Sequence, residues 1–552
     1  MPNNSLFRRK PLSKILQEGG DHAPGEGKLD RNLKLRDLVS MGIAAIVGAG
    51  IFSTIGSAAY NGGPGVVILF VIAAITCGFT ALCYAEFASR VPVAGSAYTY
   101  SYVTFGELIA WVIGWALILE YAIGNIVVAI SWSSYFNNLL RGLGIHLPGW
   151  MITDSGTAHL LYESAVADGK SLDNLAWTTA PMIGDWHIIF NLPAFVIVVL
   201  VTALVYTGIK ESKKWANGMV VFKLAVLFVV ILAGFFYVQP ENWNPFLPNG
   251  MKGVMMGVSA VFYAYIGFDA ISTTAEECEN PQRDLPRGMI YALIICTIIY
   301  VLTALVITGM VNYKEFLGVA DPLAYVFEKT GLTKLNYAIS ISAVVATTSV
   351  LLVFQIGQPR IWMSMSRDGL LPKAFSRVHP KYQTPSFATI VTGVLVAIPS
   401  LFMDAALVTD LTSIGTLFAF VLVCGGVLML PAEDKQVGKF KLPYINGQFT
   451  IPLVLLVFLF FFKERIYNAF ANFADQPHQE YLLLIFLVIA GGMTLYTFLK
   501  KWSIIPVLGV LFCTYLMIEI PIKSWFVFFG WMAMGLLIYF LYSMKNSKLM
   551  NE

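Results

Sequence analysis

The apolar residues of this chain come in runs of about twenty, long enough for a helix to cross a hydrocarbon core of ~30 Å. The 552 residues are 57% hydrophobic and 12% charged, whereas soluble domains average about 25% charged residues. A soluble protein of this length would need far more charged surface. The composition therefore excludes soluble enzymes and predicts an all-α polytopic membrane protein.

Motifs of catalysis and of metal or nucleotide binding are missing from the sequence. None of the six cysteines forms a C-x-x-C pair, and the six histidines are scattered. No H-E-x-x-H, G-x-S-x-G or Walker loop occurs. We therefore expect no catalytic centre, no metal and no cofactor, and we expect the cysteines to be buried thiols. The net charge of +3 argues against a nucleic-acid partner.

Fourteen spans are predicted from the apolar windows. They cover residues 38–60, 65–90, 105–139, 187–208, 216–238, 250–275, 287–312, 335–365, 385–403, 410–430, 449–463, 481–500, 503–520 and 524–543.

The positions of lysine and arginine predict the orientation of the spans. Most of the 36 basic residues lie in the two ends of the chain and in the even-numbered connections. Because cytoplasmic loops are enriched in lysine and arginine, we expect both ends, residues 1–37 and 544–552, in the cytoplasm. The first of these ends lacks the apolar core of a cleavable signal. The polar segment 140–186 is then extracellular, and we expect it to pack as a cap over the spans.

Glycines interrupt the middle of the first and sixth spans. The first span contains Gly42, Gly48 and Gly50, and the sixth contains Gly267 close to Asp269. The sixth span comes five positions after the first along the chain, with four spans between them, so the two segments cross the membrane in opposite directions. Paired interruptions of this kind indicate a transporter built of inverted repeats with broken helices. The alternative is that the glycines only let neighbouring helices pack closely.

Broken helices would offer backbone groups to a ligand that carries both charges. Freed N–H groups at a half-helix N-terminus attract a carboxylate, and here they belong to Gly48, Ala49, Gly50 and Ile51. Freed carbonyls attract an ammonium group, and here they belong to Ile46, Tyr263, Ala264 and Ile266. Together these groups predict a binding site for a zwitterion.

Charged residues inside the predicted spans are functional candidates, because burying them in a bilayer is costly. Lys223 in the fifth span either functions there or extends toward the cytoplasm. Glu120 in the third span faces the bundle, where it supports the site, relays a proton, senses a basic substrate or makes a structural hydrogen bond. Asp269 is expected to cap the second half of the sixth span. Phe354 either lines the pocket or packs against a neighbouring helix.

At these positions the chain resembles the amino acid–polyamine–organocation superfamily, and within it the bacterial permeases that are similar to cationic amino acid transporters. The resemblance runs from about residue 30 to 543. It rests on five stretches, which are GAGIF at 48–52, AEF and PVAGSAY between 85 and 98, AYIGFD at 264–269, EE with NP and a proline between 276 and 286, and MSRDGLLP at 365–372.

The resemblance implies a LeuT-like fold of 5+5 inverted repeats with broken helices 1 and 6. The repeats would be residues 38–238 and 250–430, followed by four appended spans in residues 449–543. It also implies secondary uptake of amino acids, usually driven by protons. A lysine at the position of Lys223 takes the place of a sodium ion in proton-coupled relatives, which makes this residue the predicted proton-coupling group.

The resemblance also assigns the two ends of the substrate. The carboxylate would meet Ala49 and Gly50, and the amine would meet the carbonyls of Ile46, Tyr263 and Ile266. Tyr263 departs from the family pattern, in which phenylalanine is usual, whereas Ala49 stands where threonine or alanine is found.

We therefore predict a proton-coupled amino acid permease of the plasma membrane that works by alternating access, with neutral, small or aliphatic L-amino acids as substrates. An exchanger of cationic amino acids or polyamines without net proton movement is the alternative, and an amino acid sensor without turnover is a third interpretation. We expect a monomer in the lipid bilayer, and a small single-span membrane subunit is the one further partner that the sequence leaves open.

Overall fold

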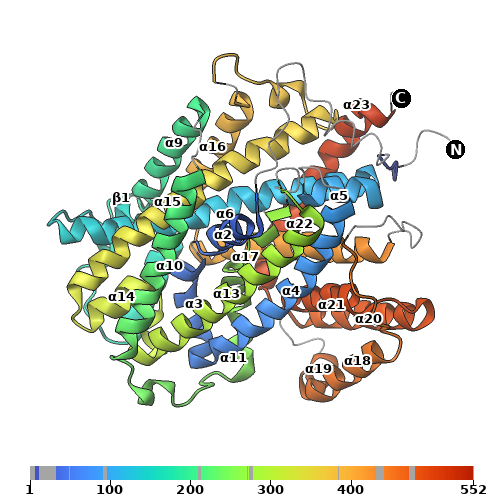
Figure 1. The fold of residues 1–552 in the computed structure, drawn as a ribbon. Coiled ribbons are helices and arrows are strands. Elements are labelled where there is room, and N and C mark those ends of the chain that lie inside the picture. Colours follow the sequence, from blue (N-terminus) through green and yellow to red (C-terminus); the bar gives the residue numbers. More distant parts are fainter. Residues whose placement is uncertain are drawn as a thin grey trace.

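The computed structural model is a helical bundle (Figure 1). It describes residues 6–10, 33–48, 50–90, 96–208, 213–269, 271–272, 278–382, 384–429, 440–471 and 479–550.

The first half of the chain holds ten α-helices, short 3-10 and π segments, and one small hairpin in its described residues. Its α-helices are α2 (Leu35–Ile46), α3 (Ile55–Gly62), α4 (Val66–Arg90), α5 (Ser96–Thr104), α6 (Glu107–Gly142), α7 (Ser155–Ala167), α8 (Ala176–Thr179), α9 (Leu192–Thr207), α10 (Lys213–Phe235) and α11 (Gly250–Met256). The hairpin pairs β1 (Met182–Ile183) antiparallel with β2 (Trp186–His187). The short helical segments are η1 (Gly50–Thr54), η2 (Gly63–Gly65), η3 (Gly149–Met151) and η4 (Pro240–Trp243).

The second half consists of helices and connections. Its α-helices are α12 (Val258–Tyr263), α13 (Pro281–Met310), α14 (Pro322–Lys329), α15 (Thr333–Arg367), α16 (Ser386–Ser400), α17 (Ala405–Met429), α18 (Thr450–Phe461), α19 (Lys463–Ala471), α20 (Gln479–Lys500), α21 (Ile504–Ile518), α22 (Ile522–Ile538) and α23 (Met544–Asn546). The short helical segments are η6 (Tyr313–Phe316), η7 (Lys373–Ser376), η8 (Tyr539–Ser543) and η9 (Lys548–Met550).

Seven helical stretches in the described residues are long and apolar enough to cross a membrane. The first of them, Leu35–Ser89, contains the first two predicted spans, and five further apolar helices have 10–17 residues. The sixth predicted span is divided between two shorter helices, α11 and α12. A polytopic helical membrane protein is confirmed at this level, whereas the count of fourteen spans, the domain boundaries and the pairing of two five-span halves stay predictions.

Helix α6 lies in the interior of the bundle, and α9 lies at its surface. The most apolar stretch of α6 is almost wholly buried. Along α9, by contrast, the exposed side chains Val196, Leu200 and Leu204 recur every four residues and so share one face. An apolar face of this kind matches a hydrocarbon surface, because a soluble protein would place polar groups there.

Helices α6 and α15 run antiparallel along each other, and their contacts fix the register between them. Trp132 donates its indole N–H to the Thr348 hydroxyl at 2.9 Å. Toward the other end, the Gln358 amide donates to the Ile118 carbonyl at 3.1 Å. This pair of helices provides the frame against which the interrupted spans are placed.

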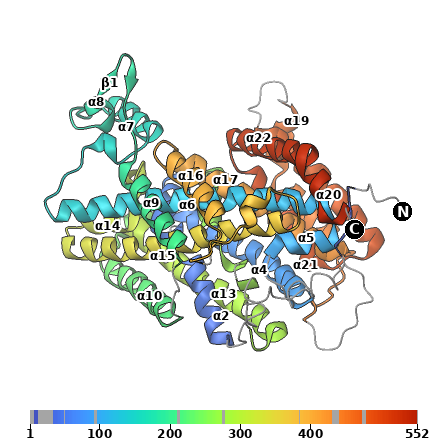
Figure 2. The same ribbon diagram turned by 90° about the horizontal axis from the view of Figure 1, so that it is seen from above.

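Residues 143–191 form a small subdomain around α7, α8 and the hairpin. It stands out to one side of the helices, at the end of the bundle opposite the chain termini (Figure 2). Leu161 of α7 touches Gly318, and the Asp404 carboxylate lies against Gly156. The hairpin and α8 extend beside the bundle, whereas α7 contacts connections between the spans, so the expected cap over the spans stays a prediction.

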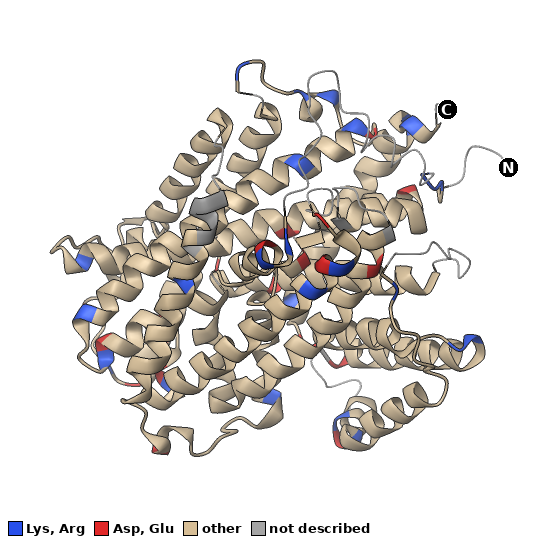
Figure 3. Ribbon diagram, viewed as in Figure 1, with Lys and Arg blue, Asp and Glu red and all other residues tan. Residues whose placement is uncertain are grey.

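The two ends of the chain meet on buried carboxylates at the opposite side of the bundle. Glu107 accepts hydrogen bonds from Arg8 at 3.2 Å, from Tyr102 at 3.2 Å and from Tyr539 at 3.1 Å, and the Ser547 hydroxyl also contacts it. Acidic and basic residues gather in this region in Figure 3. Donors from both ends of the chain therefore offset the cost of burying this carboxylate.

Asp368 at the end of α15 forms the second part of this arrangement. Its carboxylate pairs with Lys10 at 2.9 Å and accepts the Tyr98 hydroxyl at 2.6 Å. The described residues 6–10 thus connect the starts of α5 and α6 to the end of α15. No pattern in the sequence indicates that this polar segment is buried.

Replacing Glu107 by glutamine is expected to destabilise the folded protein. The change removes the negative charge that faces Arg8 from a fully buried position, and breaking a buried ion pair costs about 3 kcal/mol. Thermal unfolding of the purified protein in detergent measures the effect, and we expect the apparent Tm to fall by several degrees. Glu163→Gln is the matched control, because its side chain is 64% exposed on α7. Equal apparent Tm values for the two variants would contradict this account.

Candidate functional site

The helix of the first predicted span stops at the glycine cluster. Helix α2 ends at Ile46, and the Val47 N–H still bonds to the Ile43 carbonyl at 2.8 Å. Helical structure resumes with the π-helical turn η1 at Gly50. Ala49 lies outside the described residues. A Cβ at Gly48 would lie 2.9 Å from Val350 on α15, so the chain runs close to that helix here.

The sixth predicted span is interrupted in the same way. Helix α12 ends at Tyr263 and is followed by a turn over residues 264–267. Gly267 has φ of +112°, a conformation that L side chains rarely adopt. A Cβ there would also lie 2.9 Å from the Ala45 carbonyl oxygen. Asp269 follows this turn and is buried, but the residues after 272 that it was expected to cap lie outside the described part.

The two interruptions lie against each other. A Cβ at Gly50 would come within 2.3 Å of the Ala264 Cα, so only glycine fits at this approach. The Thr54 hydroxyl lies between two carbonyls, at 2.8 Å from Gly50 O and 2.7 Å from Ala260 O. One side chain thereby binds backbone groups of both spans.

Tyr300 of α13 provides a second link between the spans, and no sequence motif identifies it. Its hydroxyl lies 2.8 Å from the Ile46 carbonyl oxygen and 3.0 Å from that of Ala264. These are two of the carbonyls predicted to bind an ammonium group. A hydrogen-bond donor therefore already occupies the place predicted for the amine. Tyr300 stands in an apolar run, where a tyrosine resembles a packing residue.

The remaining predicted carbonyls differ in their partners. The Tyr263 carbonyl accepts the Ile266 N–H at 3.2 Å inside the turn. Ile51, Ala264 and Ile266 are all buried. The structure thus places the described residues of the predicted set, Ala49 excepted, at one junction, with internal hydrogen bonds to several of their carbonyls.

Side chains of three helices meet next to this junction. The Tyr263 hydroxyl donates to the Gly124 carbonyl at 3.2 Å. A Cβ at Gly124 would lie 3.3 Å from the ring of Phe354, which also packs edge-on against Tyr121. The hydroxyl of Tyr263, which departs from the usual family pattern, therefore ties the sixth span to the third. With Val350, these residues form a mainly apolar wall.

Glu120 is buried on the same helix, one turn from Gly124. It faces α17, where a Cβ at Gly415 would lie 3.7 Å from its own Cβ. Its Oε2 atom has no hydrogen-bond partner among the described residues. Asp269 acts on it electrostatically, so two acidic groups share this region.

Lys223 lies on α10 with its side chain only 2% exposed. Its Nζ is 3.5 Å from the Ala44 carbonyl oxygen, near the end of α2. A lysine that extended toward water would be exposed, whereas this one points to the first span just before the interruption. This contact therefore connects the fifth span to the first.

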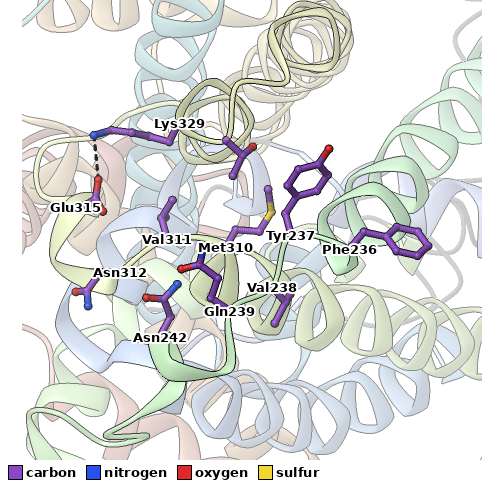
Figure 4. Close-up of a pocket in the computed structure, with 11 residues that line it drawn as sticks. Phe236, Tyr237, Val238, Gln239, Asn242, Met310, Val311, Asn312, Glu315 and Lys329 are labelled. Atoms are coloured by element: carbon purple, nitrogen blue, oxygen red, sulfur yellow. Dashed lines mark ion pairs between the residues drawn. The ribbon is translucent and has the colours of Figure 1, made fainter.

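An open cavity among the described residues lies elsewhere. It has a volume of about 610 Å³ and lies between the ends of α10, α13 and α14, beside the exposed ion pair of Glu315 and Lys329 at 3.0 Å (Figure 4). None of the residues at the two interruptions lines it. The described residues contain no group of three or more His, Cys, Asp or Glu side chains that could hold a metal ion. All six cysteines are buried, as the sequence predicted.

Comparison with known proteins places this arrangement in a family. The family model described as amino acid permease matches residues 33–493. The chain belongs to the amino acid permease family. A second model, described as the C-terminus of such permeases, matches residues 504–547. The chain is thus a multi-pass membrane transporter and not an enzyme, and its resemblance to the superfamily is confirmed.

Relatives with related activities align over most or all of the permease. The branched-chain amino acid permease BcaP of Bacillus subtilis is 39% identical over 99% of both chains. The methylthioribose transporter of the same organism is 36% identical, also over 99% of both chains. A vacuolar cationic amino acid transporter 4 of Arabidopsis thaliana is 36% identical over 77% of this chain and 67% of its own length.

Adding one methyl group at two glycines of the permease should have opposite effects on stability. Gly50→Ala places a Cβ against the Ala264 backbone, and overpacking of this kind costs about 1–3 kcal/mol. Gly78→Ala on α4 meets nothing within 4 Å, and alanine is favoured over glycine in a helix by about 1 kcal/mol. We expect a lower apparent Tm for the first variant and an equal or higher one for the second. A neutral result at Gly50 would show that the two spans are not in close contact.

Proposed function

We propose that this permease imports neutral L-amino acids with aliphatic side chains across the plasma membrane, together with protons. The observation that carries the proposal is the contact between two interrupted spans, with the buried Lys223 directed at the first of them. Interrupted helices expose backbone groups of both polarities, and a free amino acid carries both complementary charges. Import would proceed by alternating access.

The surroundings of the junction support an aliphatic side chain. Val350, Phe354 and Tyr263 lie beside it and present mainly apolar surface. The ammonium group would share or displace the Tyr300 hydroxyl at the carbonyls of Ile46 and Ala264. The relative named as a branched-chain amino acid permease fits this chemistry. Methylthioribose has neither an amino nor a carboxylate group, so it would make no use of the paired backbone charges.

Proton coupling rests on Lys223. An ammonium group near the Ala44 carbonyl holds α10 to the end of α2, and a neutral amine would hold it less strongly. Gain and loss of one proton would therefore change how the first span is held. No further cofactor takes part in this scheme.

The orientation follows from the basic residues. Both ends of the chain would be cytoplasmic, and the 143–191 subdomain would be extracellular. The permease would act as a monomer in the bilayer, with a small single-span subunit as the one candidate partner.

Uptake of cationic amino acids is the second candidate, because the Oε2 atom of Glu120 has no hydrogen-bond partner among the described residues and could meet a basic side chain. Relatives named as cationic amino acid transporters agree with it. An amino acid exchanger of this type would need no net proton movement.

Uptake of labelled leucine and arginine into proteoliposomes separates these functions. With an inwardly directed proton gradient, we expect leucine to accumulate well above its external concentration, and without the gradient only to equilibrate. Arginine should enter much more slowly. Uptake that requires preloaded amino acid and ignores the gradient would establish the exchanger instead.

Lys223→Ala tests the coupling role in the same proteoliposomes. We expect it to abolish accumulation driven by the proton gradient but to retain exchange of leucine between the two sides, since the backbone site stays intact. Lys252→Ala is the matched control, because Lys252 is an exposed lysine on α11. A Lys223→Ala protein that still concentrates leucine in response to the gradient would refute the role.

A further inference from the structure

Residues 312–332, which we call the cover, connect α13 to α15 and contain η6 and α14. They pack against α3, which continues the first span beyond its interruption. A Cβ at Gly56 would lie 3.1 Å from Pro322 and 3.2 Å from the Val319 carbonyl oxygen. On another side, Gly318 touches Leu161 of the 143–191 subdomain. The cover is therefore held between a broken span and the extracellular subdomain.

Helix α6 contacts both the cover and the first span through two side chains that lie one helical turn apart. The Asn138 amide donates to the Asp321 carboxylate of the cover at 3.1 Å. One turn earlier, the Tyr135 hydroxyl donates to the Phe52 carbonyl in η1. Asn138 and Tyr135 share one face of α6. A movement of the cover away from α6 would break the bond between Asn138 and Asp321.

We propose that Asp321 takes up a proton from the external solution as the cover closes, and that external acid therefore favours the closed cover. Asp321 acts as a positioning residue, because it touches the cover and α6 and not the substrate. The proposal rests on the proposed function for the orientation of the protein and for the place of closing in the transport cycle. It goes beyond that function by adding a second protonation site, at the outer side.

The groups around Asp321 determine how its protonation is linked to closing of the cover. Burial raises the pKa of Asp321 from its ordinary 3.8 to about 6, and the negative charge of Glu328 on α14 also raises it. The hydrogen bond from Asn138 and the positive charge of Arg141, both on α6, lower it. Tyr135 also lies within electrostatic range. The segments η1 and α3 carry no charged residue.

An open cover would return Asp321 to water and to its ordinary pKa. A group whose pKa is higher in the closed state favours that state when it is protonated. The linkage acts between about pH 6 and pH 4, where the closed form holds a proton that the open form lacks. Between pH 7.5 and pH 5 the closing equilibrium of the native protein should rise about tenfold. Near neutral pH both forms are ionised and the linkage vanishes.

Cysteine accessibility beneath the cover tests the proposal without substrate or gradient, so its outcome does not depend on coupling at Lys223. Ser131 lies on the same face of α6 as Tyr135 and Asn138. It is two helical turns from Asn138, on the side toward the interruptions. It is fully buried, and its hydroxyl has no hydrogen-bond partner among the described residues. Ser131→Cys therefore introduces a nearly isosteric thiol, and the six native thiols are buried.

The measurement is the rate at which a membrane-impermeant methanethiosulfonate, added outside, modifies the thiol of Ser131→Cys. This substitution is made in the native protein and in each Asp321 variant, which are the backgrounds of the experiment. Rates of different backgrounds are compared at the same pH, so that the effect of thiol ionisation on the rate cancels. Asp321→Asn imitates the protonated carboxyl, so its cover should stay closed at both pH values. From pH 7.5 to pH 5, the rate of the native background relative to Asp321→Asn should fall about tenfold. Asp321→Glu, which still titrates, should behave like the native background.

Asp154 provides the matched control. Burial raises its pKa too, but its side chain accepts hydrogen bonds from Thr157 in the first turn of α7 and not from α6 among the described residues. Asp154→Asn should leave the relative rate unchanged at both pH values. If the rate of the native background relative to Asp321→Asn stays constant from pH 7.5 to pH 5, or rises, the proposal is overturned.

Discussion

Hydrocarbon offers no hydrogen bonds, so each backbone group freed by a break in a transmembrane helix needs a partner within the protein. In this permease two side-chain hydroxyl groups provide partners for carbonyls at or next to the two breaks. The Thr54 hydroxyl lies between carbonyls of the first and sixth spans, and the Tyr300 hydroxyl does the same from α13. The close approach at Gly50 makes these short bonds geometrically feasible.

The other functional elements are arranged around this junction. Lys223 reaches the end of α2 just before the break, and Tyr263 connects the sixth span to α6. The same helix holds the cover and the continuation of the first span through Asn138 and Tyr135. A substrate that changes the hydrogen bonds at the junction can therefore affect contacts on both sides of it.

The sequence predicts those features that depend on local pattern. Apolar runs identify the membrane helices, and paired glycines indicate both interruptions, because only glycine tolerates a positive φ at residue 267 or the approach at residue 50. The bonds made by Thr54 and Tyr300 could not be predicted, since their partners lie far away in the sequence and their side chains look like ordinary packing residues.

The same limit applies to the ends of the chain and to the polar segment 140–186. Lys10 looked like part of a solvated basic tail, yet it is buried against Asp368, 358 residues away. The polar segment 140–186 overlaps the 143–191 subdomain between α6 and α9. Its lateral position depends on contacts such as Leu161 with Gly318, which no local pattern encodes.

The central claim is that backbone groups at the two interruptions recognise both charged ends of an amino acid. Inhibition of leucine uptake by leucine analogues tests it most directly. Leucinamide lacks the carboxylate and N-acetylleucine lacks the ammonium group, so both should inhibit at least about a hundredfold less strongly than leucine, as expected when a charge-assisted contact of roughly 3 kcal/mol is lost. Inhibition by either analogue at a concentration similar to that of leucine would contradict the account.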